Sequence, residues 1–362
     1  MMKAVYNFAS GPAILPREVM QAVQAELLDW GGRGYSVLET SHRWPDFMQI
    51  MAETEQLLRE LLSVPDNYHV LFMQGGGTQQ FAMVPLNLLG DKKQIDVIMS
   101  GYWTDKAAQE ARRYGAVRLA ADTLSEGATR LPDQAQLDIS PQSAYVYYCA
   151  NETIHGLEYD YVPQSGAVPL VADASSNLLS RAMDVAAHGL IFACAQKNFG
   201  LPGLTVVVVR KDLVGRCAPH WPAILNYQSY ADTHSLWNTP VTFAIYLAHR
   251  ILKWLKDQGG VAAIEQRNIE KAALLYRAID ESEGFYANRI APRFRSRMNA
   301  PFSLRNPALE ADFLASAQEA GLVQLQGHRS VGGLRASMYN AMPLAGVQAL
   351  VDFMHLFMHR HG

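Results

Sequence analysis

The stretch LIFACAQKNFGLPG, residues 190–203, places a lysine, Lys197, directly after an apolar run, and a second apolar run, Thr205 to Val209, follows it. Upstream, the apolar run Val168 to Ala172 leads into Asp173. Short apolar runs bounded by glycine and polar residues are typical of buried strands. The pattern therefore puts a carboxylate and an amine at the ends of successive predicted strands.

A lone lysine after a strand is usually a solvated surface charge, and Lys197 alone would favour that reading. The partner Asp173 changes the balance, because the pair suits pyridoxal 5'-phosphate. An amine forms a Schiff base with the aldehyde of this cofactor, and a carboxylate keeps its pyridine nitrogen protonated so that the ring accepts electrons. We therefore expect Lys197 and Asp173 to be catalytic.

Length and composition limit the classes of protein. The chain has 362 residues, is 49% hydrophobic and carries a formal net charge of −3, which predicts two domains and a small-molecule partner. No long basic run or apolar span of membrane length occurs, so we expect no nucleic-acid or membrane partner. Residues 1–7 lack the apolar core of a signal peptide, and we expect a cytoplasmic protein.

The three cysteines, Cys149, Cys194 and Cys217, are an odd number without metal-ligand spacing. The first two fall inside apolar runs, so we interpret them as reduced core residues and expect no metal site.

Helix and strand signals alternate as far as about Arg210, which predicts an α/β fold with a mostly parallel sheet covered on both faces. Such sheets bind ligands at the carboxyl ends of their strands. After Gly259-Gly260 the pattern changes to a mixture of helices and strands. We expect a large domain over residues 16–258 and a smaller α+β domain formed by residues 1–15 and 259–362. Strands are expected at His69–Met73, Asp96–Ser100, Tyr145–Ala150, Val168–Ala172, Leu190–Ala195, Thr205–Val209, Met298–Leu304 and Gly333–Met338. The main helices are expected at Pro16–Trp30, Phe81–Leu89, Val241–Asp257, Val261–Glu281, Leu309–Ala320 and Ala345–Arg360.

Three segments after predicted strands are further candidates for the cofactor. Gln74-Gly75-Gly76-Gly77-Thr78 precedes a helix, where glycine backbone N–H groups and the helix dipole favour a phosphate; a tight turn is the alternative. Trp103 could stack on a flat ring or pack in the core. The hydroxyl of Thr153 could contact a phenolic oxygen or cap a helix.

Cationic side chains cluster in Ser41-His42-Arg43 and in residues 327–335, which contain His328, Arg329 and Arg335. Guanidinium groups bind phosphate and carboxylate with two parallel hydrogen bonds. Taken separately, each would more often be a structural surface charge.

Together, these segments resemble the phosphoserine aminotransferase family over nearly the whole chain, within the class V, fold type I pyridoxal phosphate enzymes. The matching segments are Asn7–Pro12, Ser41–Arg43, Gln74–Phe81 with Val84–Asn87, Gly101–Trp103, Asn151–Ile154, Ala172–Ser176, Gln196–Asn198, Asn238–Pro240 and Gly327–Ala341.

The resemblance implies a homodimeric fold type I enzyme that moves the amino group of L-glutamate onto 3-phosphohydroxypyruvate, for serine biosynthesis. Some bacterial members also make a phosphorylated threonine analogue for pyridoxine biosynthesis. By position, the resemblance implies that Lys197 forms the Schiff base, Asp173 pairs with the pyridinium, Trp103 stacks on the ring and Thr153 contacts the phenolic oxygen. It implies that the cofactor phosphate is bound by Gly77, Thr78 and Gln196, together with Asn238 and Thr239 of the other subunit. For the substrates, it implies that Ser10 and Arg43 contact glutamate, that Arg335 binds an α-carboxylate, and that the substrate phosphate is bound by His42, Arg43, His328 and Arg329.

Two other functions remain to be weighed. A cysteine desulfurase-like or kynureninase-like lyase shares the fold class, but a desulfurase needs a reactive cysteine on a mobile loop, and Cys149 and Cys194 look strand-bound. A non-catalytic pyridoxal phosphate sensor would need a basic winged-helix extension, which the sequence lacks.

Overall fold

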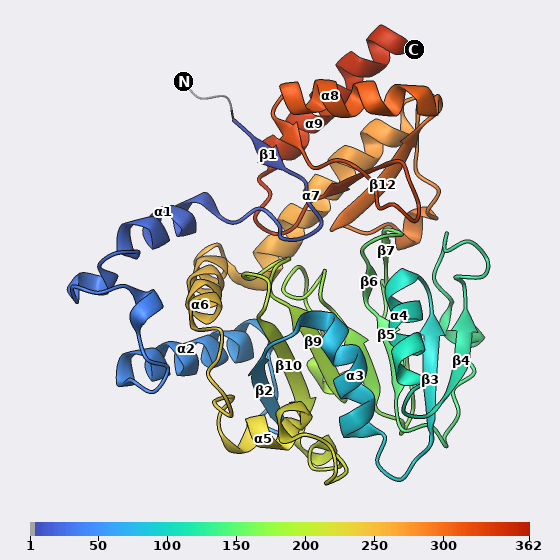
Figure 1. Ribbon diagram of the computed structural model, residues 1–362. Helices are drawn as coiled ribbons and strands as arrows, with labels where there is room; N and C mark the ends of the chain where they lie inside the picture. Colours follow the sequence, from blue (N-terminus) through green and yellow to red (C-terminus); the bar gives the residue numbers. More distant parts are fainter. Residues whose placement is uncertain (1–3) are drawn as a thin grey trace.

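The computed structural model describes residues 4–362, which form two lobes (Figure 1). Residues 1–3, which belong to the predicted small domain, lie outside the described part. The helices are α1 Arg17–Glu26, α2 Pro45–Leu62, α3 Gly76–Leu88, α4 Tyr102–Ala111, α5 Tyr227–Asp232, α6 Thr242–Asp257, α7 Gly260–Asp280, α8 Glu310–Glu319 and α9 Leu344–His361. The strands are β1 Tyr6–Asn7, β2 Tyr68–Met73, β3 Gln94–Met99, β4 Ala116–Asp122, β5 Val146–Cys149, β6 Asn151–Glu152, β7 Leu157–Glu158, β8 Leu170–Asp173, β9 Leu190–Cys194, β10 Thr205–Arg210, β11 Tyr286–Ala287, β12 Asn299–Leu304, β13 Leu322–Val323 and β14 Leu334–Ser337.

The larger lobe is built on a seven-stranded sheet with the order β2-β10-β9-β8-β5-β3-β4. All its neighbouring strands pair in parallel except β10, which is antiparallel to both β2 and β9. The prediction of an α/β fold with a mostly parallel sheet is therefore confirmed. Its parallel strands β5, β8 and β9 end at the same edge of the sheet, so residues that follow them can share one site.

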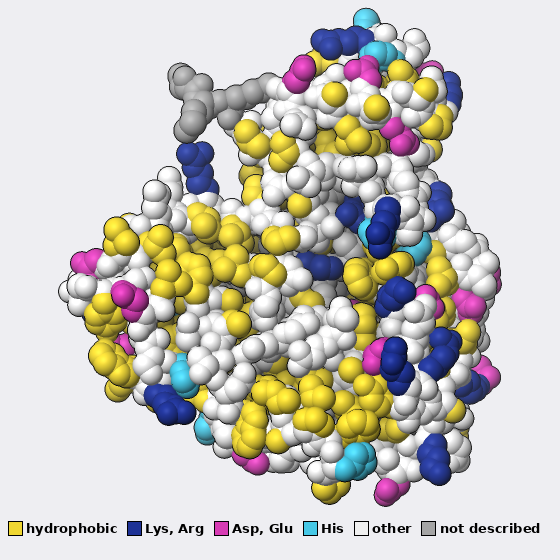
Figure 2. Space-filling model, in the orientation of Figure 1, with side chains coloured by type: hydrophobic (Ala, Val, Ile, Leu, Met, Phe, Trp, Pro, Cys, Tyr) yellow, Lys and Arg dark blue, Asp and Glu magenta, His cyan; other side chains and the backbone are white. Residues whose placement is uncertain are grey.

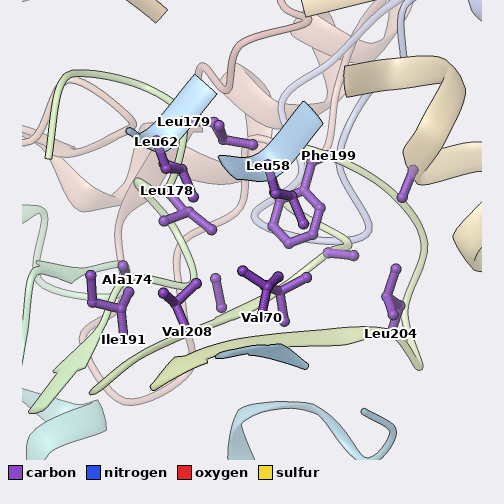
Figure 3. Packing of buried hydrophobic residues seen from close by; sticks show 14 of the residues in the cluster. Leu58, Leu62, Val70, Ala174, Leu178, Leu179, Ile191, Phe199, Leu204 and Val208 are labelled. Carbon is purple, nitrogen blue, oxygen red and sulfur yellow. The ribbon is translucent and has the colours of Figure 1, made fainter. Parts of the chain in front are cut away.

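Both faces of the sheet are buried, and alternate residues of one strand serve opposite faces. In β2, Val70 and Phe72 belong to the core beneath α1, α2 and α6, whereas Leu71 and Met73 belong to the core beneath α3, α4 and α5. Figure 3 shows part of the first core, where Leu58 and Leu62 of α2 approach Val70 and Val208 of the sheet. This close packing gives the strand ends a rigid base.

The smaller lobe packs α7, α8 and α9 with the three-stranded sheet β11-β12-β14 around a second core. The N-terminal segment joins this lobe, because β1 pairs in parallel with β13 and Phe8 is fully buried in the second core. Residues just after Phe8 are thereby carried to the boundary between the lobes. That the two lobes are separate domains, with residues 16–258 in one and residues 1–15 and 259–362 in the other, stays a proposal.

Several element boundaries differ from the sequence-based expectation. The first helix ends at Glu26 rather than Trp30, and Gly31 with a φ of 60° bends the chain just beyond it. Helix α3 begins at Gly76, so two of the three consecutive glycines lie inside it. Strand β4 was not anticipated, because it forms the edge of the sheet and most of its side chains are only half-buried, which leaves no continuous apolar run. No helix of residues 4–362 combines the length and apolar character needed to cross a membrane.

Candidate active site

A cavity of about 240 Å³ opens at the carboxyl ends of β5, β8 and β9. Residues from both lobes line it: Asp173, Lys197 and Trp103 come from the larger lobe, and Ser10 and Arg335 belong to the segments packed on the smaller one. Figure 2 shows cationic and histidine side chains gathered where the lobes meet. The cavity therefore brings together most of the predicted site, although the sequence separates its members widely.

Lys197 follows β9, and its amine is held at the floor of this cavity. The Nζ atom donates a hydrogen bond of 2.8 Å to the Oγ1 atom of Thr153, which lies in the turn after β6. It also lies 5.9 Å from the centroid of the Trp103 ring. The amine is thus placed by defined contacts, unlike a solvated surface lysine.

Asp173 is the last residue of β8 and is 5% exposed. Its Oδ1 atom accepts a 2.9 Å hydrogen bond from the backbone N–H of Ser175. Burial raises the pKa of Asp173, while the hydrogen bonds from Ser175 and the charge of Lys197 act against that rise. Since β8 and β9 are parallel neighbours, Asp173 and Lys197 flank one space, as their positions in the sequence predict.

The start of α3 forms the candidate phosphate cradle. Gly75 has a φ of 89°, which favours glycine, and the first-turn residues Gly77 and Thr78 line the cavity. The first N–H groups of a helix lack intrahelical partners and favour an anion. The Gly77 N–H instead contacts the Sγ atom of Cys194 at 2.9 Å. Cys194 is buried as expected, but its thiol also lines the cavity, which the sequence did not indicate.

Three buried polar atoms of cavity-lining residues have no hydrogen-bond partner among the described residues: Oε1 of Gln196, Nε1 of Trp103 and Nε of Arg335. A buried polar atom without a partner costs free energy, so a polar ligand at this position would stabilise it. The donors of α3, the amine of Lys197, the carboxylate of Asp173 and the Trp103 ring fit a cofactor that has a phosphate, an aldehyde and an aromatic nitrogen.

On the opposite side, Arg335 is 9% exposed and donates from Nη2 to the Oγ atom of Ser10 at 2.8 Å. Its Nε atom is buried without a partner, and within residues 4–362 no ion pair to a carboxylate is formed. Burial lowers the pKa of Arg335. A buried guanidinium without an anionic neighbour suits a ligand carboxylate.

Sequence reasoning missed the residues that hold Ser10 and Arg335 in place. The Tyr339 hydroxyl donates to the Ser10 carbonyl at 2.7 Å, and Asn299 donates to that hydroxyl at 3.1 Å. Asn299 in turn accepts from Asn151 of the larger lobe at 2.8 Å. Tyr339 lies within the matching segment Gly327–Ala341 but had no role assigned, and no motif marks Asn299, because the function of both depends on contacts across the two lobes.

Some predicted site residues do not reach this cavity. His328 lines it, but Arg329 is exposed outside it. His42 and Arg43 lie in a turn before α2, where His42 is half-buried and Arg43 is exposed. Asn238 and Thr239 precede α6, where the Thr239 carbonyl accepts from Gln74 at 2.9 Å. One chain therefore assembles most of the predicted cofactor residues, but not Asn238 and Thr239, and of the predicted substrate-phosphate cluster it brings only His328 to the cavity.

A mostly parallel sheet with a lysine and a carboxylate at neighbouring strand ends fits the class of pyridoxal phosphate-dependent enzymes. Residues 5–350 match the family model described as Aminotransferase class-V, and the chain belongs to that family. Within it, the chain is 53% identical over 362 residues to the phosphoserine aminotransferase of Acidithiobacillus ferrooxidans, with 100% of both chains covered.

Solved structures agree with this placement. The chain is similar to the phosphoserine aminotransferase of Bacillus circulans subsp. alkalophilus, with a TM-score of 0.97, 42% identity and 99% of each chain covered. A phosphoserine aminotransferase from Trichomonas vaginalis, described as bound to PLP, has a TM-score of 0.92 and 40% identity, and the match covers 97% of this chain and 99% of that one.

Proposed function

We propose that this enzyme is a phosphoserine aminotransferase, which uses pyridoxal 5'-phosphate to transfer the amino group between L-glutamate and 3-phosphohydroxypyruvate, giving O-phospho-L-serine and 2-oxoglutarate. The observation that carries the proposal is the placement of Lys197 and Asp173 on one cavity with the buried, unpaired guanidinium of Arg335 facing the same space. The full-length similarity to phosphoserine aminotransferases supports it.

Pyridoxal phosphate supplies a reactive aldehyde and a ring that accepts electrons when its nitrogen is protonated. In this chain Lys197 would hold the aldehyde end, Asp173 the ring nitrogen, and the first turn of α3 with Gln196 the phosphate. Trp103 would cover the ring. Thr153 would contact the phenolic oxygen, since its hydroxyl already lies 2.8 Å from the lysine amine.

The protein side chains then divide the work of amino transfer. The Asp173 carboxylate keeps a proton on the ring nitrogen. With the cofactor bound, the Lys197 amine would take the proton from the substrate Cα and deliver it to the carbon of the former cofactor aldehyde. Arg335, held by Ser10, fixes the substrate carboxylate, so that the Cα–H bond is presented to the amine. Each residue acts from a position that hydrogen bonds already define.

We further propose that the enzyme is a homodimer and that Arg43, His42, Asn238 and Thr239 act in the site of the partner subunit. Large apolar side chains are exposed around these segments: Leu38 is 54% exposed, Trp44 53%, Met48 49% and Trp237 47%. Exposed apolar side chains beside unpaired cations are typical of an interface. A second copy of this chain would bury them and bring the cations to the cavity.

A cysteine desulfurase-like reaction is not favoured. Burial raises the pKa of all three thiols, Cys149, Cys194 and Cys217, whereas a nucleophilic cysteine needs a lowered pKa. The kynureninase-like alternative gains no support from the relatives. The parallel reaction that yields 4-phosphohydroxy-L-threonine for pyridoxine biosynthesis, like the cytoplasmic location, stays a prediction.

Substrate choice tests this proposal. With glutamate as amino donor, kcat/KM for 3-phosphohydroxypyruvate should exceed that for hydroxypyruvate at least about 30-fold, because the phosphate neutralises cations that are otherwise left unpaired. Arg329→Ala should reduce this ratio more than it slows the reaction with glutamate alone. Equal kcat/KM values for the two keto acids would overturn the assignment of the phosphorylated substrate.

A further inference from the structure

Glu152 is a fully buried carboxylate to which the proposed reaction gives no role. It is 0% exposed and ends the short strand β6, one residue before Thr153. Its side chain points at the start of α4, the helix that carries Trp103. Within residues 4–362 it forms no ion pair with a lysine or arginine, so its charge must be stabilised in another way.

Three donors from α4 converge on this carboxylate. The backbone N–H of Trp103 donates to Oε2 at 3.0 Å, and the backbone N–H of Thr104 donates to Oε1 at 2.9 Å. The Thr104 hydroxyl is 3.0 Å from Oε1. These N–H groups are first-turn donors without intrahelical partners, and a negative charge there also interacts favourably with the helix dipole. Glu152 thus caps α4 from another element of the fold.

The Glu152 side chain lies so close to the residue before α4, Gly101, that it limits which amino acid can stand there. A Cβ atom on Gly101 would lie 2.5 Å from the Cδ atom of Glu152, so this position has room only for glycine. Burial raises the pKa of Glu152 to about 7, with a smaller contribution from Asp173, while the bonds from Trp103 and Thr104 lower it. Because the backbone groups can only donate, they favour the ionised carboxylate, although burial has the larger effect on its pKa.

We propose that Glu152 is a positioning residue for the cofactor: by fixing the backbone of Trp103, it sets the indole ring above the space between Lys197 and Asp173. No hydrogen bond anchors the indole, since its Nε1 atom has no partner among the described residues; its ring contacts Phe81 and Tyr102 at 6.4 and 5.2 Å between centroids and the Lys197 amine at 5.9 Å. The inference rests on the proposed role of Trp103 in covering the pyridoxal ring.

The test is a double-mutant cycle on cofactor affinity, measured by equilibrium dialysis of pyridoxal phosphate without substrate. Glu152→Gln turns one acceptor into a donor that faces an N–H group, and it should raise the Kd at least about tenfold. If Glu152 acts through the indole, the same change in a Trp103→Phe background should raise the Kd less than about threefold. Glu110→Gln, the same substitution further along α4, is the matched control and should leave the Kd unchanged.

An equal rise of the Kd in both backgrounds would overturn the inference, because Glu152 would then act independently of the indole. If Glu152→Gln does not fold by circular dichroism, Glu152→Asp takes its place: it keeps the charge but is one methylene shorter, and it must show the same dependence on Trp103. Failure of the wild-type protein to bind pyridoxal phosphate would instead refute the proposed function, so the two failures are distinguishable.

Discussion

The floor of the cavity, formed by Asp173, Thr153 and Lys197, and the turn before α2, which contains Arg43, differ in how firmly they hold their candidate functional residues. On the floor, Asp173 and Thr153 are buried and hydrogen-bonded, and the Lys197 amine has a defined partner. In the turn, Arg43 is exposed and no other residue of the described chain is bonded to its guanidinium. The floor is complete within one chain, whereas the turn acquires a function only if something else covers it.

The difference shows which functional groups a single chain holds in place by itself and which it does not. Groups that must hold a proton at a fixed atom sit at strand ends, where the packed sheet allows little movement. Groups that only attract an anion can be supplied from a surface. Substitutions on the floor should therefore affect the chemical step, and those in the turn should depend on assembly.

The largest effect is expected from Lys197→Ala, which removes the one lysine amine that lines the cavity among residues 4–362. Turnover should fall more than about 1,000-fold, because both covalent attachment and proton transfer are lost. The visible absorption of bound cofactor should change as well, while circular dichroism stays that of the wild type. Lys211→Ala, at an exposed site on the far end of β10, is the control. Full activity of Lys197→Ala would contradict the assignment.

Asp173→Asn should have the next largest effect. A neutral amide cannot keep the ring nitrogen protonated, so kcat at saturating pyridoxal phosphate should fall about 100-fold or more. Cofactor should still bind, since α3 and Lys197 are intact. The measurement is kcat with glutamate over a range of cofactor concentrations. Turnover that recovers fully at high cofactor concentration would mean that Asp173 serves binding alone.

Both catalytic candidates could be predicted because strand ends are visible as apolar runs. The run before Asp173 and the run before Lys197 fix two neighbouring strand ends, and the parallel order then places them together. The relay through Asn299 and Tyr339 could not be predicted, since it joins segments that only the packing of the two lobes brings together. The capping role of Glu152 was missed for the same reason.

The two segments of cations failed to converge in one chain for a different physical reason. Arg43 and Arg329 are hydrophilic surface residues, and their composition does not say which surface covers them. Sequence similarity suggested a shared function, but it did not distinguish contacts within a chain from contacts between chains. An experiment on assembly makes that distinction.

Hybrid dimers test directly whether the turn acts in the partner's site. Arg43→Ala and Lys197→Ala homodimers should each have little activity. If Arg43 serves the partner's cavity, unfolding and refolding an equal mixture should restore about a quarter of wild-type activity, because half the dimers are hybrids with one intact site. If Arg43 serves its own cavity, no site is intact and the mixture stays inactive. Sedimentation showing a fully active monomer would contradict the dimer.

The smallest effect concerns Lys271, a buried lysine of the smaller lobe that supports the Arg335 side of the cavity rather than the floor. Its Nζ atom donates to the carbonyls of Met338 and Tyr339 at 3.1 and 2.8 Å, just beyond the strand that carries Arg335. Burial lowers the pKa of Lys271 to about 7, with a smaller contribution from Arg267. A neutral amine still donates two hydrogen bonds, so deprotonation keeps this support while removing the cost of the buried charge.

The sign of the pH dependence follows from proton binding. Between pH 7 and the ordinary lysine pKa of 10.5, the unfolded chain binds more protons at Lys271 than the folded one, so stability should rise with pH. From pH 7 to pH 9 the free energy of unfolding should increase by about 2 kcal/mol relative to Lys271→Met, measured by urea denaturation. Lys253→Met, at an exposed site, should behave like the wild type. Parallel pH profiles for the wild type and Lys271→Met would show that Lys271 stays charged, and that the support behind Arg335 is ionic rather than neutral.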